Sequence, residues 1–102
     1  TQYMPPVSET EKHLVTIWAQ LLKLDENDIS INANFFELGG HSLLVVKLIA
    51  QIREKLNIEI MITDVFIQPY IRFLAQHIDD KKVYVSLKEH ESKASIKSEG
   101  TL

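Results

Sequence analysis

Ser42 is the side chain in this sequence whose surroundings most clearly suggest chemistry. It follows Gly39, Gly40 and His41 and directly precedes an apolar, periodic segment. Glycine frees the backbone from the usual φ limits, and a serine where a turn meets a helix is a preferred N-cap. Because a helix N-terminus stabilises anions, this hydroxyl is suited to carry an attached phosphate group. The alternative interpretation is a serine that only caps the helix.

The residues around Ser42 do not indicate a hydrolase. The Gly-x-Ser-x-Gly turn of such enzymes has a small residue two positions after the serine, where this chain has Leu44. His41 is adjacent in sequence, but neighbouring residues at a helix start point in different directions, so adjacency is not evidence of a catalytic pair. We therefore expect no catalytic residue in the chain.

The sequence also lacks a metal-binding pattern. No two of the four histidines are spaced i, i+4, as a metal site on a helix would require. The acidic cluster of Asp25, Glu26 and Asp28 does not fit a calcium loop, because Ile29 stands where that pattern needs an oxygen ligand. We expect no metal.

The stretch Phe35-Phe36-Glu37-Leu38-Gly39-Gly40-His41-Ser42-Leu43 closely resembles the phosphopantetheine attachment motif of peptidyl carrier domains from nonribosomal peptide synthetases. The resemblance covers about residues 3 to 79. In that family the equivalent serine carries a 4′-phosphopantetheine arm through a phosphodiester. The thiol of the arm holds the growing intermediate as a thioester. The resemblance thus implies that Ser42 is the attachment site.

The same resemblance implies a set of partners and a role without catalysis. A phosphopantetheinyl transferase would modify Ser42, an adenylation domain would load the thiol, and a condensation or thioesterase domain would consume the intermediate. The chain would be a monomeric domain of a multi-domain synthetase. His41 favours the peptide branch, because acyl carriers usually have Asp there. Two alternatives stay open: an acyl carrier domain of a polyketide or hybrid system, and an unmodified helical module that binds a protein partner.

The composition limits the classes of protein to which this chain can belong. The chain has 102 residues, of which 45% are hydrophobic and 25% charged, and a net charge of −3, as expected for one small globular domain. It has no cysteine, so any thiol chemistry must be brought in. Its apolar runs are too short for a membrane span, and its basic residues are scattered. We expect a cytoplasmic protein that binds neither membrane nor nucleic acid.

The first half of the chain predicts one helix and a long loop. Residues 1–7 read as an extended lead-in, and Ser8 with Glu11 forms a capping box that starts a helix at Glu9. From Lys23 to His41 turn residues replace the helical period. The apolar residues expected to hold this helix and loop to a core are Leu14, Ile17, Trp18, Leu21, Leu24, Ile29, Ile31, Phe35, Phe36 and Leu38.

The helix after Ser42 has a core face and an outer face. Val45, Leu48, Ile49, Ile52 and Leu56 follow the helical period of a buried stripe. Leu43 lies opposite this stripe and Val46 on its flank, so both are expected to be exposed beside Ser42. We expect partner domains to dock on an apolar surface made of Leu43, Val46, Val65, Ile67 and Tyr70.

The remaining segments complete an all-α fold, a small four-helix bundle with a long loop between helices 1 and 2 and a short third helix. Residues 58–62 are expected to be an extended connector, with Thr63 capping a helix to Ile67 and Pro69 opening the fourth helix. Its core stripe is Ile71, Leu74, Ala75 and Ile78. Residues 8–79 would form the carrier domain. Residues 80–102, rich in Ser, Lys and Glu, would be a flexible tail or interdomain linker.

Overall fold

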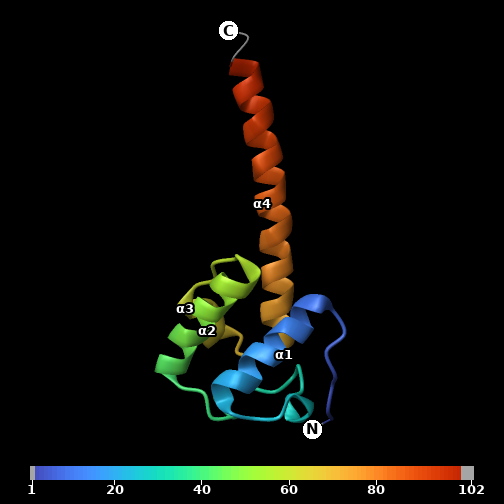
Figure 1. Ribbon diagram of the computed structural model, residues 1–102, viewed down its shortest axis with the longest axis vertical. Helices are drawn as coiled ribbons and strands as arrows, with labels where there is room; N and C mark the ends of the chain where they lie inside the picture. The colour runs from blue at the N-terminus through green and yellow to red at the C-terminus, as the bar shows by residue number, and fades with distance from the viewer. Residues whose placement is uncertain (1, 100–102) are drawn as a thin grey trace.

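The protein is described by a computed structural model that covers the backbone of residues 2–99 and the side chains of residues 2–89. Its elements are α1 (Glu9–Leu22), a 3₁₀ turn η1 (Glu26–Asp28), α2 (Ser42–Leu56), α3 (Ile62–Ile67) and α4 (Ile71–Glu99). Residues 2–99 contain no strand. The predicted all-α fold, with its long first loop and short third helix, is confirmed (Figure 1).

Helix α1 begins and ends where its sequence signals place the boundaries. The Glu11 N–H donates to Ser8 Oγ over 3.1 Å, and the Ser8 N–H donates to Glu11 Oε1 over 3.0 Å, so the predicted capping box is present. At the other end Lys23 is left-handed, with φ 57°. Its N–H donates to the Ala19 carbonyl, which closes the last turn.

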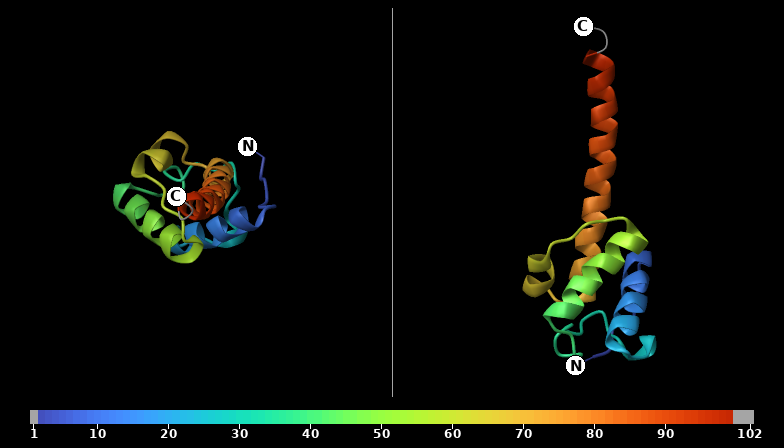
Figure 2. Two further views of the ribbon diagram at one scale, coloured as in Figure 1. Left: turned by 90° about the horizontal axis from the view of Figure 1, so that it is seen from above. Right: turned by 60° about the vertical axis from the view of Figure 1, so that its left-hand side comes forward.

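The core lies where α1, α2 and α4 meet. Helix α1 packs against both α2 and α4, and α3 packs against α2 (Figure 2). The predicted stripes fill this core: Leu14, Ile17 and Trp18 from α1, Val45, Leu48 and Ile52 from α2, and Ile71, Leu74, Ala75 and Ile78 from α4. Near the start of α1, Thr10 Oγ1 donates to Asp79 Oδ1 over 2.5 Å and ties that helix to α4.

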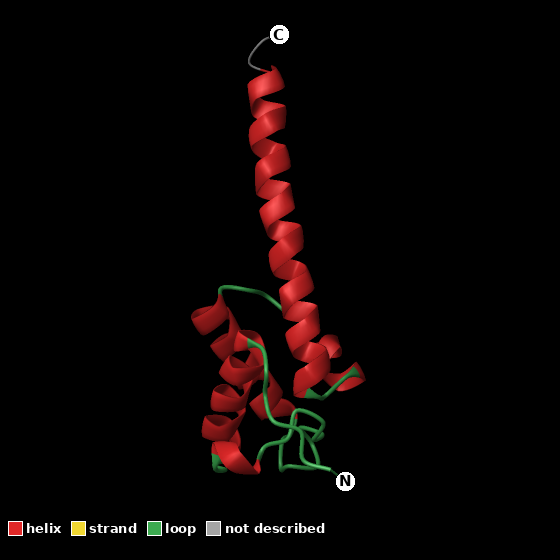
Figure 3. Ribbon diagram, turned by 90° about the vertical axis from the view of Figure 1, so that its right-hand side faces the viewer, coloured by secondary structure: helices red, strands yellow, loops and turns green. Residues whose placement is uncertain are grey.

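The long loop between α1 and α2 is anchored to the core. Ile29, Ile31 and Phe35 are buried, and the Phe35 ring meets the Trp18 ring edge-on with centroids 4.9 Å apart. The Phe35 N–H donates to the Pro69 carbonyl over 2.8 Å, and this pairing joins the loop to the start of α4. The loop gathers at one end of the bundle, near the N-terminus (Figure 3).

Two predicted helix starts are wrong. Helix α3 begins at Ile62, so Thr63 lies inside the helix and does not cap it. The carboxylate of Asp64 accepts from the Met61 N–H over 2.8 Å and takes the capping role instead. Helix α4 begins at Ile71, because the Pro69 carbonyl pairs with the loop rather than opening the helix.

Helix α4 continues beyond the point where its apolar period fades. The fading pattern predicts an end near Asp79, but the helical backbone runs to Glu99 and extends away from the bundle (Figure 1). The segment from Ile71 to Glu99 has no glycine or proline, so nothing in it breaks a helix once the core has fixed the first turns. In this extension Val83, Tyr84, Val85 and Leu87 are exposed. Lys81 Nζ donates to the Glu59 carbonyl over 2.6 Å, near the level where the bundle ends.

We predict that Gly40→Ala destabilises the protein. A Cβ at this position would overlap the Phe35 ring and lie 2.8 Å from the Phe35 carbonyl oxygen. Overpacking of this kind costs about 1–3 kcal/mol, which lowers the thermal midpoint of a domain this size by at least about 4 °C. Melting curves by circular dichroism measure the effect. Lys47→Ala, at an exposed helical position, is the control; equal midpoints for the two variants would contradict the packing argument.

Candidate functional site

Consecutive hydrogen-bonded turns around Phe35 precede Ser42. In the first turn, Asn34 Oδ1 accepts from the Phe36 N–H over 2.8 Å and from the Glu37 N–H over 3.3 Å. The Gly40 N–H then donates back to the Phe35 carbonyl over 2.9 Å. These bonds wrap the backbone around a buried ring, so the loop delivers Ser42 to a fixed place at the start of α2.

The two glycines of this loop are needed for different reasons. Gly39 has φ 108°, a backbone conformation that side chains other than glycine rarely adopt. Gly40 is needed for space, since the Phe35 ring occupies the position of its missing Cβ. Both requirements come from the tight return of the chain over Phe35.

Ser42 is exposed and is the first residue of α2, not its N-cap. The N-cap is His41, with extended backbone (φ −149°) and no capping bond from its side chain, and its carbonyl accepts from the Val45 N–H over 3.0 Å. The Ser42 hydroxyl makes no hydrogen bond with any residue whose side chain is described. The prediction that Ser42 caps the helix is wrong, because its backbone is already helical. Its hydroxyl is therefore not committed to a structural bond.

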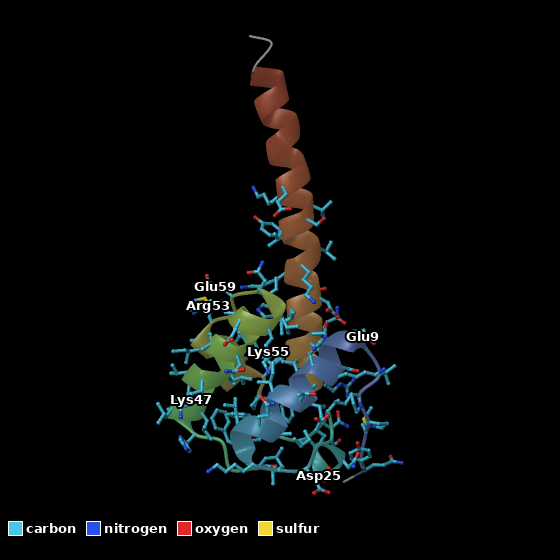
Figure 4. The ribbon with its side chains drawn as sticks, in the orientation of Figure 1. Glu9, Asp25, Lys47, Arg53, Lys55 and Glu59 are labelled. Carbon is cyan, nitrogen blue, oxygen red and sulfur yellow. The ribbon has the colours of Figure 1, made fainter. Side chains whose placement is uncertain are left out.

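The electrostatic setting of Ser42 favours a negative group. The N-terminal end of a helix carries a partial positive charge, and the first turn of α2 has no acidic residue to neutralise it. Lys47 is exposed near the beginning of α2, whereas Arg53 and Lys55 lie toward its end (Figure 4). A phosphodiester on Ser42 would meet free backbone N–H groups.

The five residues predicted to form an apolar docking surface differ in their exposure. Leu43 is 59% exposed, Val46 51% and Ile67 76%, and Tyr70 is half-buried. Val65 has no exposed surface, so its assignment to this surface is wrong. Helix α3 is too short for the spacing of its apolar residues to show which face is buried and which is exposed.

Phe66 is a surface residue that the sequence reasoning missed. It is 46% exposed, and its ring stacks on the Phe36 ring with centroids 5.2 Å apart and planes 13° apart. Phe36 precedes the glycine turn, so this contact links the loop that holds Ser42 to α3. No sequence signal separates Phe66 from the buried Val65, because adjacent apolar residues of a helix can both be buried, as Leu48 and Ile49 are.

The other candidate groups lie elsewhere. His77 Nε2 is 3.2 Å from Asp64 Oδ2, a contact between α4 and α3. Among the described residues no group of His, Cys, Asp or Glu could hold a metal ion. Within the same part of the chain, no helix is long and apolar enough to cross a membrane.

Comparisons with known proteins agree with this geometry. Residues 12–78 match the family described as Phosphopantetheine attachment site. Bacitracin synthase 3 of Bacillus licheniformis is 39% identical over 94 residues, which is 90% of this chain and 1% of that protein. The chain thus spans a very small part of the length of this relative.

Two solved structures have the same fold and related sequences. A peptidyl carrier protein, solved with the phosphopantetheine transferase Sfp and coenzyme A, is 33% identical with a TM-score of 0.73, over 76% of this chain and 99% of that one. A non-covalent extended docking domain complex of the Pax synthetase, PaxA T1-CDD/PaxB NDD, is 36% identical with a TM-score of 0.74. The match to this second structure covers 91% of both chains.

The family match covers most of the residues that form the bundle, and the solved carriers share both its helices and its sequence. The cofactor of this family is 4′-phosphopantetheine. The chain belongs to the phosphopantetheine attachment site family and is a peptidyl carrier domain of the nonribosomal peptide synthetase type.

Proposed function

We propose that Ser42 carries the 4′-phosphopantetheine arm and that the thiol of this arm tethers aminoacyl or peptidyl intermediates as thioesters. The observation that carries the proposal is an exposed hydroxyl at the start of α2 that makes no bond with the described side chains. The glycine turn fixes its position, and the N-terminal end of the helix stabilises the negative charge of the attached phosphodiester.

The chain acts in this proposal as a non-catalytic carrier. In the modification step the Ser42 oxygen bonds to the phosphorus that bears the pantetheine, the phosphoanhydride bond of coenzyme A breaks, adenosine 3′,5′-bisphosphate leaves, and the hydroxyl proton passes to a base of the transferase. No base lies within hydrogen-bonding distance of Ser42 among the described side chains, so the transferase supplies it. A solved relative bound to such a transferase supports this partner.

The carrier brings its cargo to several partner domains in turn. An adenylation domain loads the thiol, and a condensation or thioesterase domain consumes the thioester. Tethering makes each encounter intramolecular, with effective concentrations on the order of millimolar for a short flexible link. The domain itself needs only a stable bundle, an exposed attachment residue and a surface that partners recognise.

We predict that Ser42→Ala abolishes modification and leaves the fold intact. After incubation with coenzyme A and a phosphopantetheinyl transferase, intact mass spectrometry should detect one phosphopantetheine on the wild type and none on the variant. Because Ser42 makes no capping bond, the free energy of unfolding should change by less than about 0.5 kcal/mol. Ser86→Ala, exposed on α4, is the control and should be modified like wild type. An unmodified wild type would instead favour an unmodified interaction module.

We propose that partner domains read an apolar surface beside Ser42. Leu43, Val46, Phe66 and Ile67 are its exposed members, and Tyr70 is half-buried. Helices α2 and α3 both contribute, and the stack of Phe66 on Phe36 holds α3 against the loop that leads to Ser42. An apolar patch around a charged arm lets a partner bind the domain and reach the thioester together.

We predict that Leu43→Asp weakens loading without unfolding the domain. Leu43 is 59% exposed, so the substitution should leave the thermal midpoint nearly unchanged. A carboxylate forced into an apolar interface must be desolvated without a partner, at a cost of a few kcal/mol or roughly tenfold or more in loading efficiency. Loading of the pantetheinylated chain by its adenylation domain is the measurement. Leu87→Asp, 63% exposed on the extension of α4, is the matched control. Equal loading of both variants would refute the docking surface.

We propose a second role for the extension of α4 beyond the bundle, in place of the flexible tail expected for residues 80–102. The specific observation is the match over 91% of both chains to a carrier solved in a docking domain complex, whereas the carrier bound to Sfp covers 76% of this chain. Val83, Tyr84 and Leu87 are exposed on one face of this helix and give it an apolar surface that another synthetase chain can bind, whereas the exposed Val85 lies on the opposite side.

We predict that a chain ending at Lys82 folds and is modified normally but transfers its cargo poorly to a separate synthetase polypeptide. The core stripe ends at Ile78 and the Lys81 bond to Glu59 is retained, so the thermal midpoint should match that of the full chain. Melting curves, intact mass and transfer of cargo to the accepting polypeptide measure the three properties. A large drop in the midpoint would place residues 83–102 in the core, and unchanged transfer would make the extension a connector only.

A further inference from the structure

A groove runs between the end of α1 and the beginning of α2. It has a volume of about 490 Å³. Leu21 and Leu22 of α1 form one wall, and Leu43 and Leu44 of α2 form the other. Leu21, Leu22 and Leu44 also pack against the core, so the walls of the groove are held in place by the bundle.

The groove lies beside the proposed attachment residue, although Ser42 itself is not part of its lining. His41 and Leu43, which flank Ser42 on either side in the sequence, both line it, and so does Gly39 of the turn. A group attached to Ser42 is therefore next to the groove wherever its far end points. Leu43 also belongs to the docking surface, so the groove and that surface share one side chain.

The chemistry of the groove matches that of the arm. Lys23 and Lys47 lie in its lining, and no carboxylate does. The arm has an anionic phosphodiester at its attached end, then a carbon with two methyl groups, two amides and a thiol. The lysines suit the anion, and the leucine walls suit the methyl groups and the methylene chain.

We propose that this groove is a resting site for the phosphopantetheine arm of this chain when no partner domain is bound. The inference rests on the proposed attachment at Ser42. Tethering makes a weak site sufficient, because an effective concentration on the order of millimolar half-fills a groove whose dissociation constant is also millimolar. A partner that covers Leu43 removes part of one wall, so docking releases the arm toward the partner.

The test places a spin label on the thiol of the arm. The wild-type chain, labelled with ¹⁵N, is modified from coenzyme A and its thiol is coupled to a nitroxide maleimide. Amide signals close to the nitroxide are then broadened in the NMR spectrum. Residues 39–47 are uninformative because they adjoin the attachment site. Residues 20–23 are decisive, since they reach the arm only through the fold, and residues 62–67 of α3 are the comparison.

The expected result is stronger broadening at residues 20–23 than at residues 62–67, relative to the same sample after reduction of the nitroxide. Leu43→Ala, which shortens a wall of the groove, should reduce this broadening at least about twofold. Val46→Ala, on the same helix and similarly exposed but outside the groove lining, is the matched control. Broadening that is stronger at α3, or equal at both segments, would overturn the resting site.

The same sample separates the two levels of the inference. Intact mass before labelling reports whether the arm is attached, and peptide mapping reports whether it is attached to Ser42. A chain that is not modified at Ser42 refutes the proposed function. A chain that carries the arm on Ser42 without preferential broadening at residues 20–23 refutes only the resting site.

Discussion

The burial of Phe35 is the interaction on which the rest of the structure depends. Its ring has no exposed surface and meets Trp18 of α1, while its backbone N–H bonds to the Pro69 carbonyl before α4. The same residue sets the glycine turn, since the chain returns over its ring at Gly40 and bonds to its carbonyl. This one residue therefore joins α1 to the segment before α4, closes the long loop and positions Ser42.

In the proposed function, helix α2 uses one face for stability and the other for recognition by partner domains. Val45, Leu48 and Ile52 face the core, whereas Leu43 and Val46 remain outside it. Leu43 and Val46 are each more than half exposed, so they contribute little to the core. The outer face can therefore change with the partner domain at little cost in stability.

Much of the fold can be predicted from the sequence, because most of its helices have long stripes of periodic apolar residues and local capping signals. The Ser8 and Glu11 capping box and the stripes of α1, α2 and α4 are where the periodicity predicts them. The errors have a common origin in contacts between distant segments. The Pro69 carbonyl accepts a hydrogen bond from Phe35 in the loop. Val65 is buried, and a six-residue helix is too short for its apolar period to predict which side is buried. At the site, the motif predicts Ser42 as the attachment residue, but only the backbone geometry shows that Ser42 is the first residue of the helix and not its cap.

The continuous helix from Ile71 to Glu99 has a mechanical consequence for any partner held at its far end. A helix rises about 1.5 Å and turns about 100° per residue, so the part beyond Ile78 is a rod roughly 30 Å long. A flexible linker of equal length would let a bound partner move in all directions around its attachment point. This helix instead fixes the partner's distance from Ser42 and its direction around the helix axis. Deleting two residues would move the bound partner to the opposite side of the helix axis. Deleting seven would leave its direction almost unchanged and only shorten its distance from the bundle.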